Sequence, residues 1–179
     1  MGAGLSPIQM PILDIVKYPE SVLSEPTRPV ENFDANLREL AADMIDTMHA
    51  APGIGLAAPQ VGRTERLCVL DLSVGENEEA LLVLVNPRVV EEEGNVREEE
   101  GCLSFPDLMI VVPRPERVVV EAQDLDGNLF RVMGEELMAR CLHHEIDHLD
   151  GVLFIDRVSP LKRDLARRKI RRRIQAQDW

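Results

Sequence analysis

The sequence predicts an α+β fold in which antiparallel β-sheets pack around a central helix, with a further helix at the C-terminal end. Two observations predict this fold class. Apolar residues recur at helical spacing near the N-terminus and again beyond residue 134, and the region between them consists of short β-branched runs separated by turn residues. The short spacing of these runs favours hairpins over crossover connections, so we expect antiparallel pairing.

The first helix is expected at residues 33–50, where apolar side chains share one helical face. Asn32 or Asp34 can cap its start, and Pro52 with Gly53 ends it. Short strands are expected at residues 67–72, 81–85, 89–93, 117–123 and 129–133, with a hairpin turn at 124–128. Helices are expected again at residues 135–149 and 160–174.

Length and composition indicate one globular domain. The chain has 179 residues, of which 45% are hydrophobic, enough for a core of its own. Residues 1–10 look like a short tail ahead of a single domain at 11–179, which includes the C-terminal helix. No apolar run approaches the roughly 20 residues that span a membrane, so no membrane partner is expected.

The charge and the cysteine content indicate where the protein acts and which partners it can have. The three cysteines cannot all pair with one another and the first residues lack secretory or transit features, so a reducing cytoplasm is expected. The net charge is −12, yet residues 161–179 hold eight basic and two acidic side chains. The acidic body argues against broad nucleic-acid binding, whereas the basic tail is either a solvated helix or a docking element.

The most specific local signal is the pentapeptide HEIDH at residues 144–148. His144 and His148 are four residues apart, so both rings lie on one helical face and can reach one cation. Glu145 between them can take a proton from a water on that cation. The plain alternative is a helix with two histidines that are solvated or in the core.

A catalytic metal site needs a third protein ligand and an open position. Cys141 precedes His148 by seven residues, about 10.5 Å along a helix, so we interpret it as core packing. Cys68 lies inside an apolar strand and is also interpreted as a core residue. Cys102 follows a glycine at the end of an acidic run and is the ligand that we favour.

Three segments together resemble the motifs of the peptide deformylase family, in the same order and at similar separation: GIGLAAPQ at residues 53–60, EGCLS at 100–104 and HEIDH at 144–148. The resemblance extends from about Pro11 to Arg173. It implies a metal-dependent hydrolase of bacterial type that removes the N-formyl group from the starting methionine of newly made polypeptides and releases formate.

The resemblance also implies roles for individual residues. Cys102, His144 and His148 would bind the metal, and Glu145 would be the general acid and base for a metal-bound water that attacks the formyl carbon. Gln60 and the backbone N–H of Leu103 would contact the developing oxyanion. The implied working ion is Fe(II), with zinc, nickel or cobalt able to replace it.

Substrate contacts are expected around the same motifs. Gly55 belongs to the segment that would pair with the extended substrate backbone, and Ile54, Leu137 and Cys141 are expected walls of a methionine pocket, although plain core packing is an alternative for each. Two positions depart from the common family pattern. His143 replaces a frequent glutamine and is expected near the metal ligands or at the surface, and Met109 replaces an arginine found in some members.

Other functions remain open at this point. The basic helix at 160–174 resembles the element with which bacterial deformylases contact the ribosome, and a solvated helix is the alternative. A zincin-type peptidase shares the HEIDH pattern but normally has a later ligand, whereas the chain has no histidine beyond His148. A noncatalytic module stabilised by a metal is the third reading, and its fourth coordination position would be filled by protein.

Overall fold

The structure is a computed structural model of the chain and describes residues 12–179. The tail expected at residues 1–10 lies outside the described residues. The helices are α1 (Ala35–Ala50), α2 (Glu136–Leu149) and α3 (Pro160–Gln175). The strands are β1 (Gly55–Ala57), β2 (Leu67–Leu70), β3 (Leu82–Glu93), β4 (Val96–Cys102), β5 (Phe105–Arg114), β6 (Arg117–Gln123) and β7 (Leu129–Glu135).

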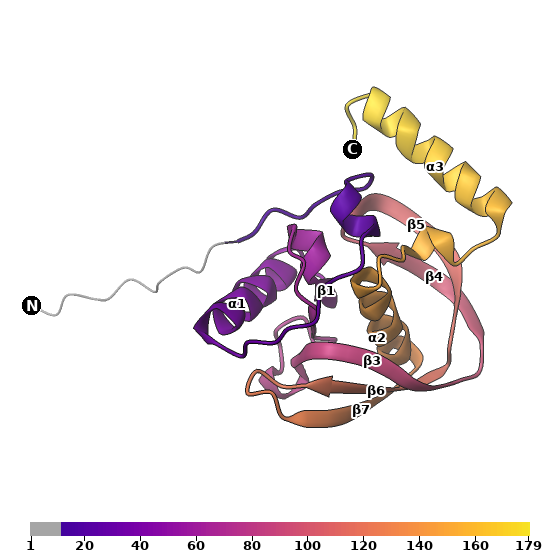
Figure 1. The fold of residues 1–179 in the computed structure, drawn as a ribbon. Coiled ribbons are helices and arrows are strands. Elements are labelled where there is room, and N and C mark those ends of the chain that lie inside the picture. The colour runs from indigo at the N-terminus through magenta and orange to yellow at the C-terminus, as the bar shows by residue number, and fades with distance from the viewer. Residues whose placement is uncertain (1–11) are drawn as a thin grey trace, which may run out of the picture.

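The strands form two antiparallel sheets on either side of α2. The larger sheet has the order β1-β2-β3-β6-β7, and β4 pairs with β5 in a separate hairpin. Figure 1 shows α2 in the middle of the molecule, with β3, β6 and β7 of the large sheet below it, the hairpin of β4 and β5 above it and to the right, and α3 at the edge beyond the hairpin. The expected α+β fold with antiparallel sheets around a central helix is confirmed.

Local sequence signals explain where the helices begin. The Asp34 side chain accepts a hydrogen bond of 3.1 Å from the Leu37 backbone N–H and satisfies a free donor at the start of α1. The Ser159 side chain accepts from the Lys162 N–H at the start of α3, where Pro160 supplies a backbone angle suited to the first turn. No helix within residues 12–179 has the length and apolar character needed to cross a membrane.

One expectation about the strands was wrong, and one hairpin was not expected. The runs at 81–85 and 89–93 are one strand, β3, because Asn86 forms a bulge instead of a break. Asn86 has a φ of 52°, and its side-chain amide donates to the Val30 carbonyl and to Gln123 Oε1. The hairpin of β4 and β5 was not expected, because β4 is rich in acidic residues and β5 contains two prolines beside its apolar residues.

Three apolar clusters hold the described elements together. One cluster joins α2 to the face of the large sheet that α2 covers, and a second packs α1 against β1 and β2. The third joins β5 to α3 and to the short 3-10 helix at Phe154–Asp156. The α2 side chains belong to the first cluster, and the third contains none of them. The contact between α2 and the hairpin is therefore of another kind.

Candidate active site

Helix α2 presents different chemistry on its different sides, and nearly all of it is buried. Leu142, Ile146 and Leu149 pack against the large sheet. His144 and His148 lie one turn apart on the side that faces the hairpin, with 8% and 1% of their surface exposed. The sheet therefore fixes the helix, and the helix holds both imidazoles at a defined height along its axis.

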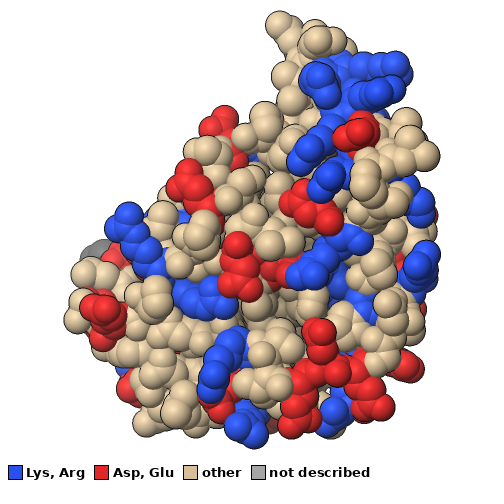
Figure 2. Space-filling model, turned by 45° about the vertical axis from the view of Figure 1, so that its right-hand side comes forward, with Lys and Arg blue, Asp and Glu red and all other residues tan. Residues whose placement is uncertain are grey.

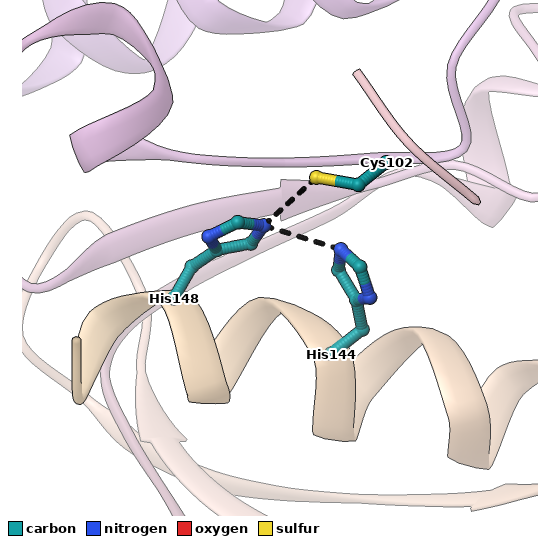
Figure 3. Close-up of side chains that lie close together, drawn as sticks. All are labelled: Cys102, His144 and His148. Carbon is teal, nitrogen blue, oxygen red and sulfur yellow. Dashed lines mark hydrogen bonds between the residues drawn. The ribbon is translucent and has the colours of Figure 1, made fainter. Parts of the chain in front are cut away.

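Cys102 meets these two histidines from the other side. It ends β4, and the tight turn between β4 and β5 directs its thiol toward α2. Cys102 Sγ lies 3.3 Å from His148 Nε2, which lies 3.2 Å from His144 Nε2 (Figure 3). The three ligand atoms all lie within 4.8 Å of one another.

The donor set fits a divalent cation. Ligands at ~2.0–2.3 Å in tetrahedral geometry are about 3.3–3.8 Å apart, close to the distances of His148 Nε2 from Cys102 Sγ and from His144 Nε2. One thiolate and two imidazoles suit zinc and the neighbouring transition metals. Three protein donors also leave a tetrahedral position open for water or substrate.

A buried carboxylate fixes the tautomer of His144. Glu100 Oε1 lies 2.5 Å from His144 Nδ1, so that nitrogen carries the proton and Nε2 keeps its lone pair for a cation. Burial alone would raise the pKa of Glu100, but the hydrogen bonds from His144 and Arg114 outweigh it and hold that pKa far below its usual value. Glu100 is therefore a permanent anion next to the three ligand atoms.

The imidazoles respond to this environment in opposite ways. Burial, followed by the proximity of His144, lowers the pKa of His148 well below its ordinary value and keeps the ring neutral, the form that binds metals. Burial also opposes protonation of His144, but its hydrogen bonds with Cys102 and Glu100 raise its pKa. The site thus attracts one positive charge, which a metal cation can supply in place of a proton.

Glu145 is buried beside Cys102 and His144, and its carboxyl group titrates in an unusual range. Burial is the main reason that its pKa rises from 4.5 to about 7. Its Oε2 atom has no hydrogen-bond partner among residues 12–179. Gly55 on β1 lies against it, since a Cβ atom at Gly55 would be 2.9 Å from the Glu145 carboxyl carbon. Only glycine leaves room for this carboxylate.

Gln60 faces Cys102 with the donor end of its amide. Its Oε1 accepts from the Ala57 backbone N–H at 2.9 Å, which leaves Nε2 to point the other way. Nε2 lies 3.5 Å from Cys102 Sγ and 3.3 Å from Ser104 Oγ. The amide is 1% exposed and has a fixed orientation, so it presents an N–H donor beside the thiol.

A cavity of about 560 Å³ opens beside these groups. Ile54, Gly55, Leu103, Leu137 and Cys141 line it, together with Gln60, Cys102, His144 and Glu145. Leu137 is 49% exposed and lies at its rim, whereas Cys141 is buried with its thiol 3.5 Å from the Ile54 carbonyl. The cavity therefore joins an apolar wall to the polar centre.

Comparisons with known proteins agree on one family. The family model described as polypeptide deformylase matches residues 12–164. A peptide deformylase of Acidobacterium capsulatum is 54% identical over 170 residues, which cover 95% of this chain and 100% of that protein. The chain belongs to the peptide deformylase family. It is accordingly an enzyme, a metal-dependent hydrolase that removes the N-formyl group from the N-terminal methionine of new polypeptides.

Solved structures of peptide deformylases have the same fold. The crystal structure of the Legionella pneumophila peptide deformylase has a TM-score of 0.86 and 46% identity, and the match covers 93% of this chain and 98% of that one. The peptide deformylase of Synechococcus elongatus, solved in complex with actinonin, has a TM-score of 0.84 and 41% identity, and the match covers 91% of this chain and 90% of that one.

The structure brings the expected site residues of this deformylase to one place. The three expected metal ligands, Cys102, His144 and His148, are mutual neighbours, and the seven expected catalytic and substrate residues line the cavity beside them. His143 is buried, with Nδ1 2.8 Å from Arg114 Nη1, and thus lies behind the ligands and away from the surface. Met109 is 56% exposed at the cavity.

The sequence reasoning missed a buried ionic network behind the ligands. Arg114 on β5 contacts Glu100 through two nitrogens, at 3.0 and 2.6 Å, and reaches Asp147 on α2. Arg140 on α2 donates to Glu100 at 2.8 Å. Asp147 and Arg140 could have been noticed because they lie three and four residues from His144 and are its neighbours on the helix surface. Nothing in the sequence pairs Arg114 with Glu100, fourteen residues earlier.

Proposed function

We propose that Cys102, His144 and His148 hold the divalent cation of this deformylase, and that the cavity beside them receives the formyl-methionyl end of the substrate. One observation carries the assignment: a thiol and two imidazole nitrogens from distant segments meet within 4.8 Å beside a cavity of about 560 Å³. When bound there, a divalent cation supplies Lewis acidity that activates water and polarises the formyl oxygen.

Glu145 moves the proton in this proposal. A carboxyl with a pKa of about 7 is poised to accept and to return a proton near neutral pH. Glu145 accepts the proton of the water that attacks the formyl carbon, and then gives it to the departing amine nitrogen. Burial protects the carboxylate from bulk water during both transfers.

Gln60 and Leu103 stabilise the negative charge that develops on the formyl oxygen. The Gln60 amide is held with Nε2 beside the thiol, and the Leu103 backbone N–H follows Cys102 in the tight turn. Both donors are preorganised, so they need little rearrangement as the charge appears. One such donor is worth about 3 kcal/mol in the transition state.

The apolar wall of the cavity selects methionine. Ile54, Leu137 and Cys141 supply aliphatic and sulfur surface next to the polar centre. Gly55 has no side chain to hold the substrate backbone away from β1, so an extended peptide can lie close to that strand. The polar centre then contacts the formyl group while the methionine side chain is buried.

Fe(II) is the proposed working metal, with zinc, nickel or cobalt as replacements. A mixed sulfur and nitrogen donor set accepts each of these ions, and availability decides among them. The family resemblance favours Fe(II). Residues 11–179 are proposed to act as one catalytic domain in the bacterial cytoplasm, where formylated nascent chains arise.

Helix α3 is proposed to contact ribosomal RNA. Figure 2 shows Lys and Arg side chains gathered over the upper part of the molecule, where Figure 1 places α3. Three basic side chains of the helix already have partners in this chain: Arg173 donates to the Pro106 carbonyl, and Arg163 and Arg167 lie near the Asp156 carboxylate. The remaining basic side chains of the helix are exposed: Lys162, Arg168, Lys169, Arg171 and Arg172. Such contacts weaken steeply as salt rises.

Ribosome pelleting tests this contact. At low salt, full-length protein is expected to sediment with ribosomes, and a variant with these five exposed residues replaced by glutamine is expected to stay in the supernatant. Both proteins must have the same formate-releasing activity on a free peptide. Equal sedimentation of the two proteins would remove the ribosome proposal.

The catalytic assignment is tested by formate release from formyl-Met-Ala-Ser, using protein purified without oxygen and analysed for metal. One equivalent of metal and rapid formate release are expected, and Cys102→Ala is expected to lose both. Glu145→Gln is expected to keep the metal and lose the activity. Cleavage of unblocked peptides would indicate a zincin-type peptidase. Unaltered function in Glu145→Gln would indicate a noncatalytic metal module.

A further inference from the structure

The elements that carry the ligand atoms do not share an apolar cluster. Cys102 lies on the hairpin of β4 and β5, and both histidines lie on α2. The apolar side chains of α2 pack with the large sheet, whereas those of β5 pack with α3 and the 3-10 helix at Phe154–Asp156. Apolar packing alone therefore does not set the position of the thiol relative to the imidazoles.

Charged hydrogen bonds make the connection instead. Glu100 on β4 accepts from His144 and from Arg140, both on α2. Arg114 on β5 binds Glu100 within the hairpin and reaches Asp147 on α2. These side chains are at most 9% exposed, so their mutual orientation is not relaxed by water.

Arg140 is the residue of α2 that reaches both strands of the hairpin. It lies one turn before His144 and is 5% exposed. Its Nη1 donates to Glu100 Oε2 on β4 at 2.8 Å and to the Val112 carbonyl on β5 at 3.2 Å. Its Nε forms an ion pair at 3.5 Å with Glu98, also on β4, but neither Nε nor Nη2 has a hydrogen-bond partner among residues 12–179. A single guanidinium thus ties the helix to two neighbouring strands.

We propose that Arg140 is a positioning residue of the metal site, which sets the distance between the Cys102 hairpin and the histidine helix. The inference rests on the proposed assignment of Cys102, His144 and His148 as ligands. Glu100 lies two residues before Cys102 on β4, so a hydrogen bond that fixes the Glu100 carboxylate also fixes the position of the end of this strand. Arg140 acts through Glu100 and the Val112 carbonyl, and it does not itself bind the metal.

The physical reason lies in the direction of the contacts. A planar guanidinium fixes the angle and the distance of its acceptors, whereas apolar contacts resist separation but permit sliding. Without Arg140, Glu100 Oε2 retains only the donor from Arg114, which belongs to the hairpin itself. The hairpin then keeps only two kinds of charged hydrogen bond with α2, between Glu100 Oε1 and His144 and between Arg114 and Asp147 or His143, so it can shift relative to α2 more easily.

The test compares Arg140→Met with a matched control, Arg66→Met. Arg66 also pairs with a carboxylate, Asp150 at 2.7 Å, and donates to the Pro87 carbonyl, but it touches none of the ligand residues. Zinc affinity is measured by competition with a chromophoric chelator, and the geometry is followed by the visible absorption of the cobalt-loaded proteins. Thermal unfolding of each protein is recorded without metal.

Arg140→Met is expected to bind zinc about 10- to 100-fold more weakly, as losses of supporting contacts around metal ligands do. Its cobalt spectrum is expected to change, because the sulfur no longer holds its place relative to the nitrogens. Arg66→Met is expected to keep the affinity and the spectrum of the parent even if its unfolding temperature falls. Parent-like zinc affinity and cobalt spectrum in Arg140→Met would overturn the proposal.

Two further outcomes remain decisive. If Arg140→Met does not fold, Arg140→Lys takes its place, and weaker zinc binding by a folded Arg140→Lys supports positioning. Loss of the fold in both variants would assign Arg140 to stability and overturn the proposal. Failure of the ligand assignment has a different signature, since Cys102→Ala would then bind zinc as tightly as the parent, whatever Arg140→Met does.

Discussion

Replacing Gly55 with alanine probes how closely β1 and α2 approach each other at Glu145. A Cβ atom at Gly55 would overlap Glu145 Oε1 and would lie 2.9 Å from the Glu145 carboxyl carbon, whereas ordinary contacts begin at 3.4 Å. The nearer carboxyl oxygen must therefore move by about 1 Å. Because a misplacement of ~1 Å costs about 100-fold in rate, we expect kcat to fall roughly 100-fold.

The same substitution has a calculable effect on stability. Overpacking lowers the free energy of unfolding by about 1–3 kcal/mol. The reduced conformational freedom of the unfolded chain raises it by about 0.4–1 kcal/mol, because Gly55 is not among the glycines with a positive φ. The net loss is up to about 2.5 kcal/mol. For a chain of this size that corresponds to a fall in Tm of up to about 10 °C.

Gly134→Ala is the matched control for Gly55→Ala. Its Cβ would lie 2.8 Å from Leu142 Cδ1 and 3.0 Å from the Ala139 backbone nitrogen, so it crowds α2 from β7, away from the cavity. Steady-state formate release and thermal unfolding are measured on both variants. Gly134→Ala is expected to lose Tm and keep kcat. A parent-like kcat in Gly55→Ala, or an equal loss of kcat in the control, would refute the reasoning.

Three other predictions follow from the same geometry. Glu145→Gln is expected to lower kcat by about 10²- to 10⁴-fold. The pKa of Glu145 is about 7 in the folded chain instead of 4.5. Between these two pH values the folded state binds more protons than the unfolded state, so the free energy of unfolding falls as pH rises from 4.5 to 7. Metal-stripped Glu145→Gln should accordingly be more stable than the metal-stripped parent above pH 7, by up to about 3 kcal/mol in urea unfolding, and equal stability at pH 8 would contradict the raised pKa. Gln60→Ala is expected to lower kcat by roughly 10²- to 10³-fold with little change in KM, and a pure KM effect in steady-state kinetics would exclude an oxyanion role. Removal of the metal by a chelator is expected to abolish formate release and to lower Tm. The loss of Tm follows because a cation at 100 times its Kd stabilises the fold by about 2.7 kcal/mol. Added zinc should restore both the activity and the Tm.

The sequence predicted the helices well because their signals are local. The start of α1 follows from Asp34 and the apolar face beyond it, and the HEIDH pentapeptide places two histidines on one side of α2 whatever the rest of the chain does. The β6–β7 hairpin was likewise expected from the turn residues at 124–128, and Gly127 in this turn has a φ of 84°.

What the sequence could not show depends on contacts between distant residues. Strand β3 continues through Asn86 because Val30 and Gln123, far away in sequence, accept hydrogen bonds from its amide. The β4–β5 hairpin depends on its contacts with other elements, and the sequence of β4 alone resembles an acidic loop. Cys102 was chosen by eliminating Cys68 and Cys141, but its separation from the imidazoles needed coordinates. Local patterns therefore identify the candidate residues, and tertiary pairing decides where they meet.

The three sides of α2 explain why an enzyme of this kind buries a helix with so many charges. One side is apolar and anchors the helix to the large sheet, a second carries His144 and His148, and a third carries Arg140 and Asp147. Buried charges cost free energy unless they are paired, and apolar replacements of buried ion pairs are often equally stable. The third side is therefore poorly explained by stability alone. It is better explained by positioning. The expected ligands lie on α2 and on the hairpin, which share no apolar cluster, so charged hydrogen bonds must set the angle and the distance between these two elements.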